Sequence, residues 1–274
     1  MSYIMPNQDR VTCTIDDNNI ATVTLNRPDK LNAIDMDMFM AVNQLTRELK
    51  KNKTLRAVIV TANGSDFCSG LDVKSLLTSK VGALKLLFKW WPTQANAAQR
   101  FSTGWREIPC PVIFAIHGKC WGGGLQLACG GDFRIASYDS NFSIMEGKWG
   151  LIPDMGGSLA FREVMRQDHT LEMAMTAKVI DSQTAKSYGL VTHLSSDPYM
   201  EAYNLALECV NRSPDAIAAN KKLYQKTWWT SPGKALMLET WYQIKVGMSK
   251  NMIIAGQRER NREEPRAFEA RQFK

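Results

Sequence analysis

The stretch that decides the fold runs from Ala115 to Gly157 and reads AIHGKCWGGGLQLACGGDFRIASYDSNFSIMEGKWGLIPDMGG. Within it an apolar strand leads into the glycines Gly122–Gly124, and the residues after them favour the start of a helix. Glycines let a backbone approach a ligand closely, and the first N–H groups of a helix lack an internal partner. Such a turn can hold a developing oxyanion. The carboxylates of Glu146 and Asp154 follow, so the stretch indicates enolate chemistry on an acyl compound.

A second stretch has the same layout. The apolar run Ala57–Thr61 predicts a strand, and the segment Asn63–Lys74, NGSDFCSGLDVK, predicts a glycine-containing turn followed by a helix. A single glycine-rich turn is as well explained by a tight change of chain direction. Two such turns, however, can supply two backbone N–H donors to one oxygen atom.

The chain carries five motifs that occur in the same order in one known family. The motifs are Leu25–Ala33, Phe67–Asp72, His117–Gly124, Glu146–Gly157 and Ser182–Val191. With them the chain resembles the crotonase family, also called the enoyl-CoA hydratase/isomerase superfamily, over most of its length. The resemblance implies an α/β fold, namely a crotonase-like spiral of ββα repeats with a C-terminal helical oligomerisation region.

The hydrophobic pattern alone indicates only the α/β class. It predicts a hairpin of Val11–Ile15 with Ile20–Leu25, a helix over Asp35–Lys50, and buried strands at Ala57–Ala62 and Val112–Ile116. After about residue 196 the strand signal fades into helical periodicity. We therefore expect a crotonase-fold CoA-binding catalytic core over residues 1–195 and a helical trimerisation region over 196–274. The resemblance implies a homotrimer or a dimer of trimers.

The composition excludes several classes of protein. With 274 residues, of which 45% are hydrophobic and 22% charged, the chain can form one large domain with an appendage. The net charge of +7 contains no block of five like charges, which argues against nucleic acid as a partner. The six cysteines form no CxxC pair and no signal peptide is visible, so we expect a cytoplasmic protein. No run of 18 apolar residues is present, so we expect no membrane insertion.

The resemblance assigns roles to particular residues of the substrate site. It implies that the backbone N–H groups of Ser69 and Gly123 form the oxyanion hole and that Glu146 is the acid–base. The expected contacts to CoA, which enters as part of an acyl-CoA thioester, are Lys30, Asn32, Ala33, Leu71, Asp72, Lys74, Phe268 and Arg271. The expected acyl pocket contains Phe88, Trp90, Trp91 and Trp149, although the first three can equally form a subunit contact. We expect neither a metal ion nor a separate cofactor.

Gln126 departs from the family's hydratase pattern, which has a glutamate both there and at the place of Glu146. An amide orients water by hydrogen bonds but is not a usable base. One carboxylate suffices to move a proton between two carbons, so we favour a double-bond shift in an unsaturated acyl-CoA over hydration of a 2-enoyl-CoA. A third hypothesis is that the protein binds CoA without catalysing a reaction. Asp154 stands where the family's dienoyl-CoA isomerases have an aspartate. Two other roles are open for its side chain: the nucleophile of a dehalogenase and the N-cap of a helix.

Overall fold

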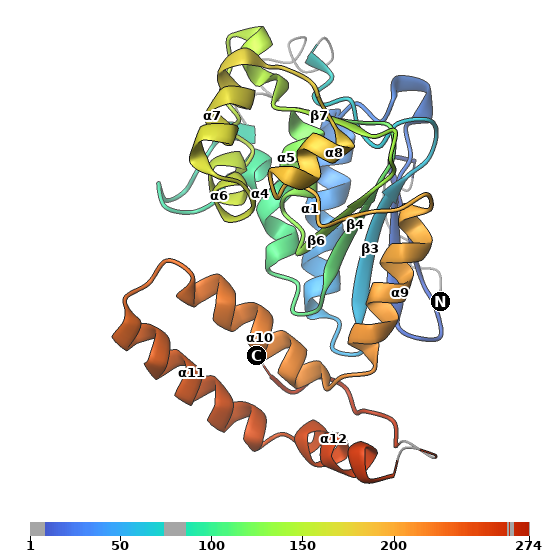
Figure 1. Ribbon diagram of the computed structural model, residues 1–274, viewed down its shortest axis with the longest axis vertical. Coiled ribbons are helices and arrows are strands. Elements are labelled where there is room, and N and C mark those ends of the chain that lie inside the picture. Colours follow the sequence, from blue (N-terminus) through green and yellow to red (C-terminus); the bar gives the residue numbers. More distant parts are fainter. Residues whose placement is uncertain (1–8, 74–85, 262, 264–265, 274) are drawn as a thin grey trace.

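The computed structural model describes residues 9–73, 86–261, 263 and 266–273. A six-stranded sheet runs through the upper part of the molecule, and its strand order is β1-β2-β3-β4-β6-β9 (Figure 1). The strands are β1 (Val11–Ile15), β2 (Ile20–Leu25), β3 (Ala57–Ala62), β4 (Val112–Ile116), β6 (Phe133–Ala136) and β9 (His193–Leu194). The first two form an antiparallel hairpin and every other pairing in this sheet is parallel. The predicted hairpin and the α/β class are confirmed.

Alternate residues of the central strands face two different layers of helix. Val58 and Val60 of β3 belong to the main apolar core, together with residues of α1 (Met36–Lys51). Ala57 and Ile59 face the opposite way and pack with α9 (Pro198–Val210) in a second core. This two-residue alternation, with both faces covered, explains why β3 reads as one continuous apolar run.

The strand that leads into the predicted turn at Gly122–Gly124 belongs to a second, three-stranded sheet. It has the order β5-β7-β8 and consists of β5 (Lys119–Trp121), β7 (Asn141–Ser143) and β8 (Ile180–Asp181). The remaining helices of the upper part are α4 (Ala97–Arg106), α5 (Gly123–Ala128), α6 (Gly157–Val164), α7 (Gln167–Thr176) and α8 (Ser182–Ser187), with the 3-10 helices η1 (Pro28–Lys30) and η2 (Met145–Trp149). Side-chain caps fix two helix starts, because Asp35 accepts from Met38 N–H and Asp181 accepts from Thr184 N–H.

The last helices lie below the core in a layer of their own (Figure 1). They are α10 (Pro214–Thr227), α11 (Pro232–Gly247) and α12 (Lys250–Arg260). A small core that includes Ala218, Tyr242 and Phe273 joins α10, α11 and the C-terminal tail. The domain boundary at residue 195 stays a prediction, although α9 packs on the sheet and not with this layer. Among the described residues, no helix has the length and apolarity needed to cross a membrane.

Candidate active site

The two glycine-containing turns lie side by side. Cys68 donates its N–H to the carbonyl of Lys119 at 2.9 Å, and Trp121 donates its N–H to the carbonyl of Cys68 at 2.9 Å. A Cβ placed on Gly70, where φ is +99°, would lie 3.8 Å from the nitrogen of Gly123. Both turns therefore depend on glycine, and the backbone after Gly70 adjoins the first turn of α5.

The backbone donors of the site are Leu71 and Gly123. The prediction for Ser69 is wrong, because its N–H donates to the carbonyl of Leu31 at 3.0 Å. In the described part of the chain the N–H groups of Leu71 and Gly123 donate no hydrogen bond, and both residues line one cavity. The motif alone could not show which backbone N–H, that of Ser69 or that of Leu71, is left without an acceptor. This depends on how the segment pairs with the loop at Leu31.

The cavity beside these donors has a volume of about 230 Å³, and we call it the Glu146 cavity. Glu146 lies in η2, is 6% exposed and lines the cavity with Met145 and Trp149. Gly122 leaves room for its carboxylate, because a Cβ on Gly122 would lie 3.3 Å from Glu146 Oε1. The structure thus brings the predicted acid–base and the backbone donors to one place.

Gln126 holds Glu146 in a single orientation. Its Oε1 accepts the backbone N–H groups of Met155 at 2.8 Å and Gly157 at 3.0 Å. Since both donors face the amide oxygen, the amide nitrogen must point the other way, and it donates to Glu146 Oε1 at 2.6 Å. Glu146 Oε2 is buried and has no hydrogen-bond partner among the described residues. One oxygen of the carboxylate is therefore fixed by Gln126 and the other is available to a substrate.

Burial makes Glu146 a stronger base than an exposed carboxylate. The pKa of Glu146 is raised, mainly because burial disfavours its charge; its own backbone N–H and the amide of Gln126 act to lower it, and the charge of Asp154 raises it. Partial burial also raises the pKa of Asp154. Asp154 does not line the Glu146 cavity, and the N-cap of α6 is Gly156, so the N-cap alternative for Asp154 is wrong.

The predicted CoA residues of the first motif mainly brace two loops. Asn32 is fully buried, accepts the N–H of Arg27 and donates to the carbonyls of Asn63 and Asp66, each at 2.8 Å. Arg27, which sequence reasoning missed, donates to the carbonyl of Ala33 and to Asp72, both at 2.9 Å. The side chains of Asn32 and Asp72 are thus held by the protein itself.

The other predicted CoA contacts have different outcomes. Leu71 lines the Glu146 cavity, and Lys30 is exposed at the end of η1. The prediction for Lys74 lies outside the described residues. Phe268 lies between the guanidinium groups of Arg56 and Arg258, whose carbons are 5.5 and 4.7 Å from its ring centre.

Of the predicted CoA contacts among the described residues, only Leu71 lines the Glu146 cavity. Neither Phe268 nor Arg271 lines the Glu146 cavity, and Arg271 faces a separate one. Sequence spacing could not reveal this, because the tail is tied to another part of the core, where the N–H of Arg271 donates to the carbonyl of Lys53.

Most of the predicted acyl-pocket residues lie outside the Glu146 cavity. Phe88, Trp90 and Trp91 are 59%, 84% and 67% exposed and do not line the Glu146 cavity, so only Trp149 of the predicted group does. Trp121 is the aromatic wall that the sequence analysis missed; its Nε1 donates to Asn141 Oδ1 at 2.7 Å and fixes the ring. Apolar character alone did not separate the exposed aromatic cluster from a substrate pocket. In the described ranges, no group of three or more His, Cys, Asp or Glu side chains is placed to hold a metal ion.

Comparisons with known proteins show the family and the fold of this chain. Residues 16–255 match the family described as Enoyl-CoA hydratase/isomerase. A carnitinyl-CoA dehydratase of Citrobacter koseri is 31% identical over 214 residues, covering 76% of this chain and 77% of the relative. The structure of an enoyl-CoA hydratase from Mycobacterium tuberculosis H37Rv has a TM-score of 0.82 at 25% identity and covers 94% of this chain and 98% of its own.

A structure from Thermobifida fusca YX, solved in complex with CoA, has a TM-score of 0.76 at 23% identity and covers 86% of this chain and 92% of its own. At this identity the likeness concerns the fold. Together these likenesses confirm the predicted crotonase-like fold.

Proposed function

The chain belongs to the enoyl-CoA hydratase/isomerase family, and we propose that it shifts a carbon–carbon double bond within an unsaturated acyl-CoA thioester. The observation that carries this proposal is the amide of Gln126 at 2.6 Å from Glu146. An amide held by two backbone donors cannot take a proton, and Glu146 is the one carboxylate among the described residues that line the cavity. A double-bond shift needs only one base.

The proposed reaction uses the two oxygens of Glu146 differently. The thioester carbonyl binds the N–H groups of Leu71 and Gly123, which stabilise the negative charge of the enolate by about 3 kcal/mol per donor. Glu146 Oε2 removes the proton at C2 of a 3-enoyl thioester, and the electron pair moves onto the carbonyl oxygen. When the electron pair returns from the carbonyl oxygen to the carbon chain, C4 takes the proton from Oε2. The product is the 2-enoyl thioester. Every atom is conserved, and no cofactor takes part.

Three features support CoA esters as the substrates and a trimer as the assembly. The family and the CoA-bound structure of the same fold support the CoA ester. The resemblance implies a homotrimer or a dimer of trimers. On α11 the exposed side chains of Trp241 and Ile244 provide an apolar surface that such an assembly would cover.

Hydration is the second candidate, and the names of the relatives favour it. The Citrobacter koseri relative is named a dehydratase and several structures of the same fold are named hydratases. In this chain, hydration would require Glu146 Oε2 to activate water without a second carboxylate. We expect that reaction to be slower than the double-bond shift.

The substitution Gln126→Glu tests the proposal. The new carboxylate can still accept from Met155 and Gly157, but its second oxygen would face Glu146 Oε1, where the amide nitrogen lies 2.6 Å away. Two carboxylates at that distance titrate as a coupled pair and share a proton at neutral pH. We expect hydration of a 2-enoyl-CoA to rise and isomerisation of a 3-enoyl-CoA to fall.

The matched control is Gln126→Leu, which removes the amide without adding a carboxylate. This variant should lower both activities. If Gln126→Glu leaves the ratio of the two activities unchanged, Gln126 does not set the reaction type.

A further inference from the structure

A second cavity, of about 540 Å³, lies where the C-terminal layer meets the end of α1. Its walls come from α1, the loop after α4, helix α10 and the C-terminal tail, and it shares no lining residue with the Glu146 cavity. We call it the basic cavity because it is lined by the cations Lys50, Lys51, Lys53, Arg106, Lys221, Lys222, Lys226 and Arg271. Glu107 is the one acidic side chain among the described residues that line it. The sequence analysis assigned only Arg271 among them, to CoA.

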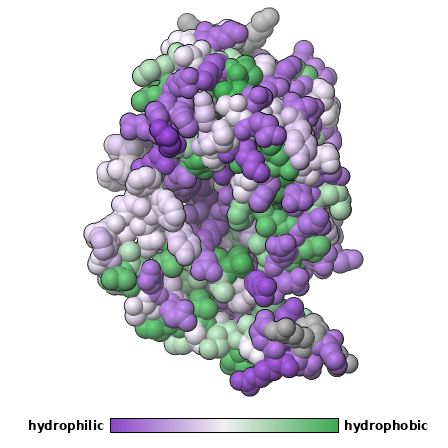
Figure 2. Space-filling view, viewed as in Figure 1, coloured by the Kyte–Doolittle hydropathy of each residue, from purple (hydrophilic) through white to green (hydrophobic). Residues whose placement is uncertain are grey.

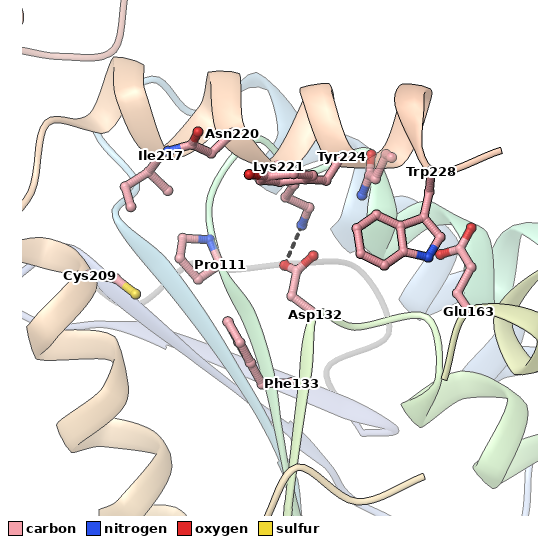
Figure 3. A pocket seen from close by; sticks show the side chains of 11 residues that line it. Pro111, Asp132, Phe133, Glu163, Cys209, Ile217, Asn220, Lys221, Tyr224 and Trp228 are labelled. Carbon is pink, nitrogen blue, oxygen red and sulfur yellow. Dashed lines mark hydrogen bonds and ion pairs between the residues drawn. The ribbon is translucent and has the colours of Figure 1, made fainter. Parts of the chain in front are cut away.

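Three of these cations are neutralised by carboxylates. Lys50 pairs with Glu107 at 2.7 Å and Arg106 pairs with Glu163 at 2.7 Å. Figure 3 shows Lys221 on α10 pointing from the helix to Asp132, with which it pairs at 2.6 Å. These ion pairs hold α10 and the C-terminal end of α4 against the core. The positive charges of these three side chains are therefore compensated.

Arg271 is a buried charge that the chain does not compensate in the same way. It is 9% exposed, its Nη1 donates to the carbonyl of Phe273, and in the described part of the chain no carboxylate lies within 4.0 Å of it. Asp215 is nearby, but its oxygens accept from the backbone of Gln272 and Phe273 and from the amide of Asn251. A buried guanidinium without a paired anion is unfavourable.

The other cations of the cavity repel one another. Lys51, Lys53 and Lys226 have no ion pair among the described residues. The pKa of Lys222 is lowered, first by burial and then by the charges of Lys226, Lys245, Lys50 and Arg271. Burial likewise lowers the pKa of Arg271, against the opposing influence of Cys110 and Asp215. The protein therefore holds a concentration of positive charge in a hollow that an anion can enter.

We propose that the basic cavity is a binding site for a small polyanion with at least two adjacent phosphate groups, whether free or carried by a nucleotide. Several cations around one hollow suit a ligand with several adjacent negative charges, and guanidinium and ammonium groups are the side chains that bind phosphate. The volume falls within the range of about 300–1,000 Å³ that is usual for small-molecule sites. This site is independent of the double-bond chemistry at Glu146.

Occupation of the cavity has a mechanical consequence. Lys51 and Lys53 belong to the core, whereas Lys222, Lys226 and Arg271 belong to α10 and the tail. An anion between them contacts both parts and binds only when they are assembled. The ligand should therefore raise the unfolding temperature, and this rise should continue with the logarithm of the ligand concentration once that concentration exceeds Kd.

The experiment titrates ATP, inorganic tripolyphosphate and adenosine into the full chain by isothermal calorimetry, with and without saturating free CoA. The test variant is Lys222→Gln/Lys226→Gln. The matched control is Lys186→Gln/Lys234→Gln, which removes the same net charge from two exposed lysines that do not line the cavity. Circular dichroism verifies that each variant is folded.

We expect one molecule of ATP or tripolyphosphate per chain and no binding of adenosine. The test variant should bind at least about tenfold more weakly, the loss expected from removing one charge-assisted hydrogen bond, and the control should bind as the wild type does. Steady-state kinetics of the test variant with an acyl-CoA should be unchanged.

Three results would overturn the proposal. The first is a folded wild type that binds neither ATP nor tripolyphosphate. The second is an equal loss of binding in the control, which would indicate general attraction to a cationic surface. The third is competition by CoA together with a raised KM for acyl-CoA in the test variant, which would make the cavity part of the substrate site.

Discussion

Glu146 and Gln126 form a pair in which one side chain does the chemistry and the other orients it. The amide oxygen of Gln126 is occupied by Met155 and Gly157, so the amide nitrogen has one place to point, which is Glu146 Oε1. Burial of Glu146 raises its pKa, and the amide works in the opposite direction. In the proposed mechanism, a single difference at position 126, amide for carboxylate, selects between the double-bond shift and hydration.

The first prediction concerns the pH dependence of Gln126→Leu. Glu146 must be ionised to accept a proton, so kcat/KM of the wild type should rise with pH through the raised pKa of Glu146. Leucine removes a hydrogen bond that lowers this pKa, so the rise should move to higher pH in the variant. A pH profile of kcat/KM for both proteins measures the shift. An unmoved profile with a uniformly lower rate would mean that Gln126 is only structural.

The second prediction concerns the stability of Glu146→Gln. Because burial raises the folded-state pKa of Glu146, the folded state binds more protons than the unfolded state between the two pKa values. The unfolding free energy of the wild type should therefore fall as pH rises through that window. Glutamine carries no charge, so the variant should gain stability relative to the wild type as pH rises from about 4 to 7.

Urea unfolding at several pH values measures this difference. The control is Glu172→Gln, since Lys178 lowers the pKa of the exposed Glu172 and the sign of its effect is opposite. A difference between Glu146→Gln and the wild type that is constant with pH would contradict the raised pKa.

At the scale of elements, the site lies where two turns of the chain are held side by side by backbone hydrogen bonds. The turn before Leu71 and the turn before α5 share backbone hydrogen bonds through Cys68 and Trp121. Both Ser69 and Leu71 line the cavity, but the N–H of Ser69 donates to the carbonyl of Leu31, whereas the N–H of Leu71 donates no hydrogen bond among the described residues. The donors are backbone groups, and their positions depend on glycines and not on any functional side chain.

The third prediction concerns Gly123. A Cβ at this position would lie 3.0 Å from both Ile34 Cδ1 and Met155 Sδ, so a side chain must displace its neighbours and enter the donor site. Gly123→Val should lower kcat by about 10²-fold or more, the usual loss of an oxyanion donor, and Gly123→Ala should lose less. Gly233→Val is the control, because nothing lies within 4 Å of a Cβ there. Equal turnover of Gly123→Val and wild type would place the oxyanion site elsewhere.

Local patterns predicted the elements, and tertiary alignment decided the site. The hairpin and the strand Ala57–Ala62 follow from alternation and apolar runs, which act over a few residues. The choice of Leu71 over Ser69 depends on a loop some forty residues away. Exposed Trp90 could not be distinguished from a pocket residue, because an apolar side chain has the same sequence signal in either place.

At the scale of the whole molecule, the C-terminal layer presents apolar side chains that its own chain leaves uncovered. Figure 2 shows green, apolar side chains over the lower part of the molecule, where α10 and α11 lie. On α11 the large exposed apolar residues are Leu236, Met237, Trp241 and Ile244, and exposed Met248 follows at its C-cap; from Met237 onward they recur every three or four residues. A contiguous surface of this kind is typical of an interface between proteins.

The fourth prediction is that this surface joins copies of the chain. In light scattering after size-exclusion chromatography, the wild type should have the mass of a trimer or of two trimers. Trp241→Glu/Ile244→Glu introduces charge into the interface and should yield smaller species. Lys234→Glu, on an exposed position of the same helix, should leave the mass unchanged. A wild type that is monomeric in solution would contradict the proposed trimer.

The most direct test of the proposed function is the ratio of two rates for the wild type. One assay follows formation of the conjugated 2-enoyl thioester from a 3-enoyl-CoA, and the other follows its loss by hydration. We predict that isomerisation is faster and that Glu146→Gln lowers it by about 10²-fold or more, the usual contribution of a positioned proton-transfer group. A wild type that hydrates 2-enoyl-CoA readily and leaves 3-enoyl-CoA unchanged would contradict the proposal and establish the hydratase.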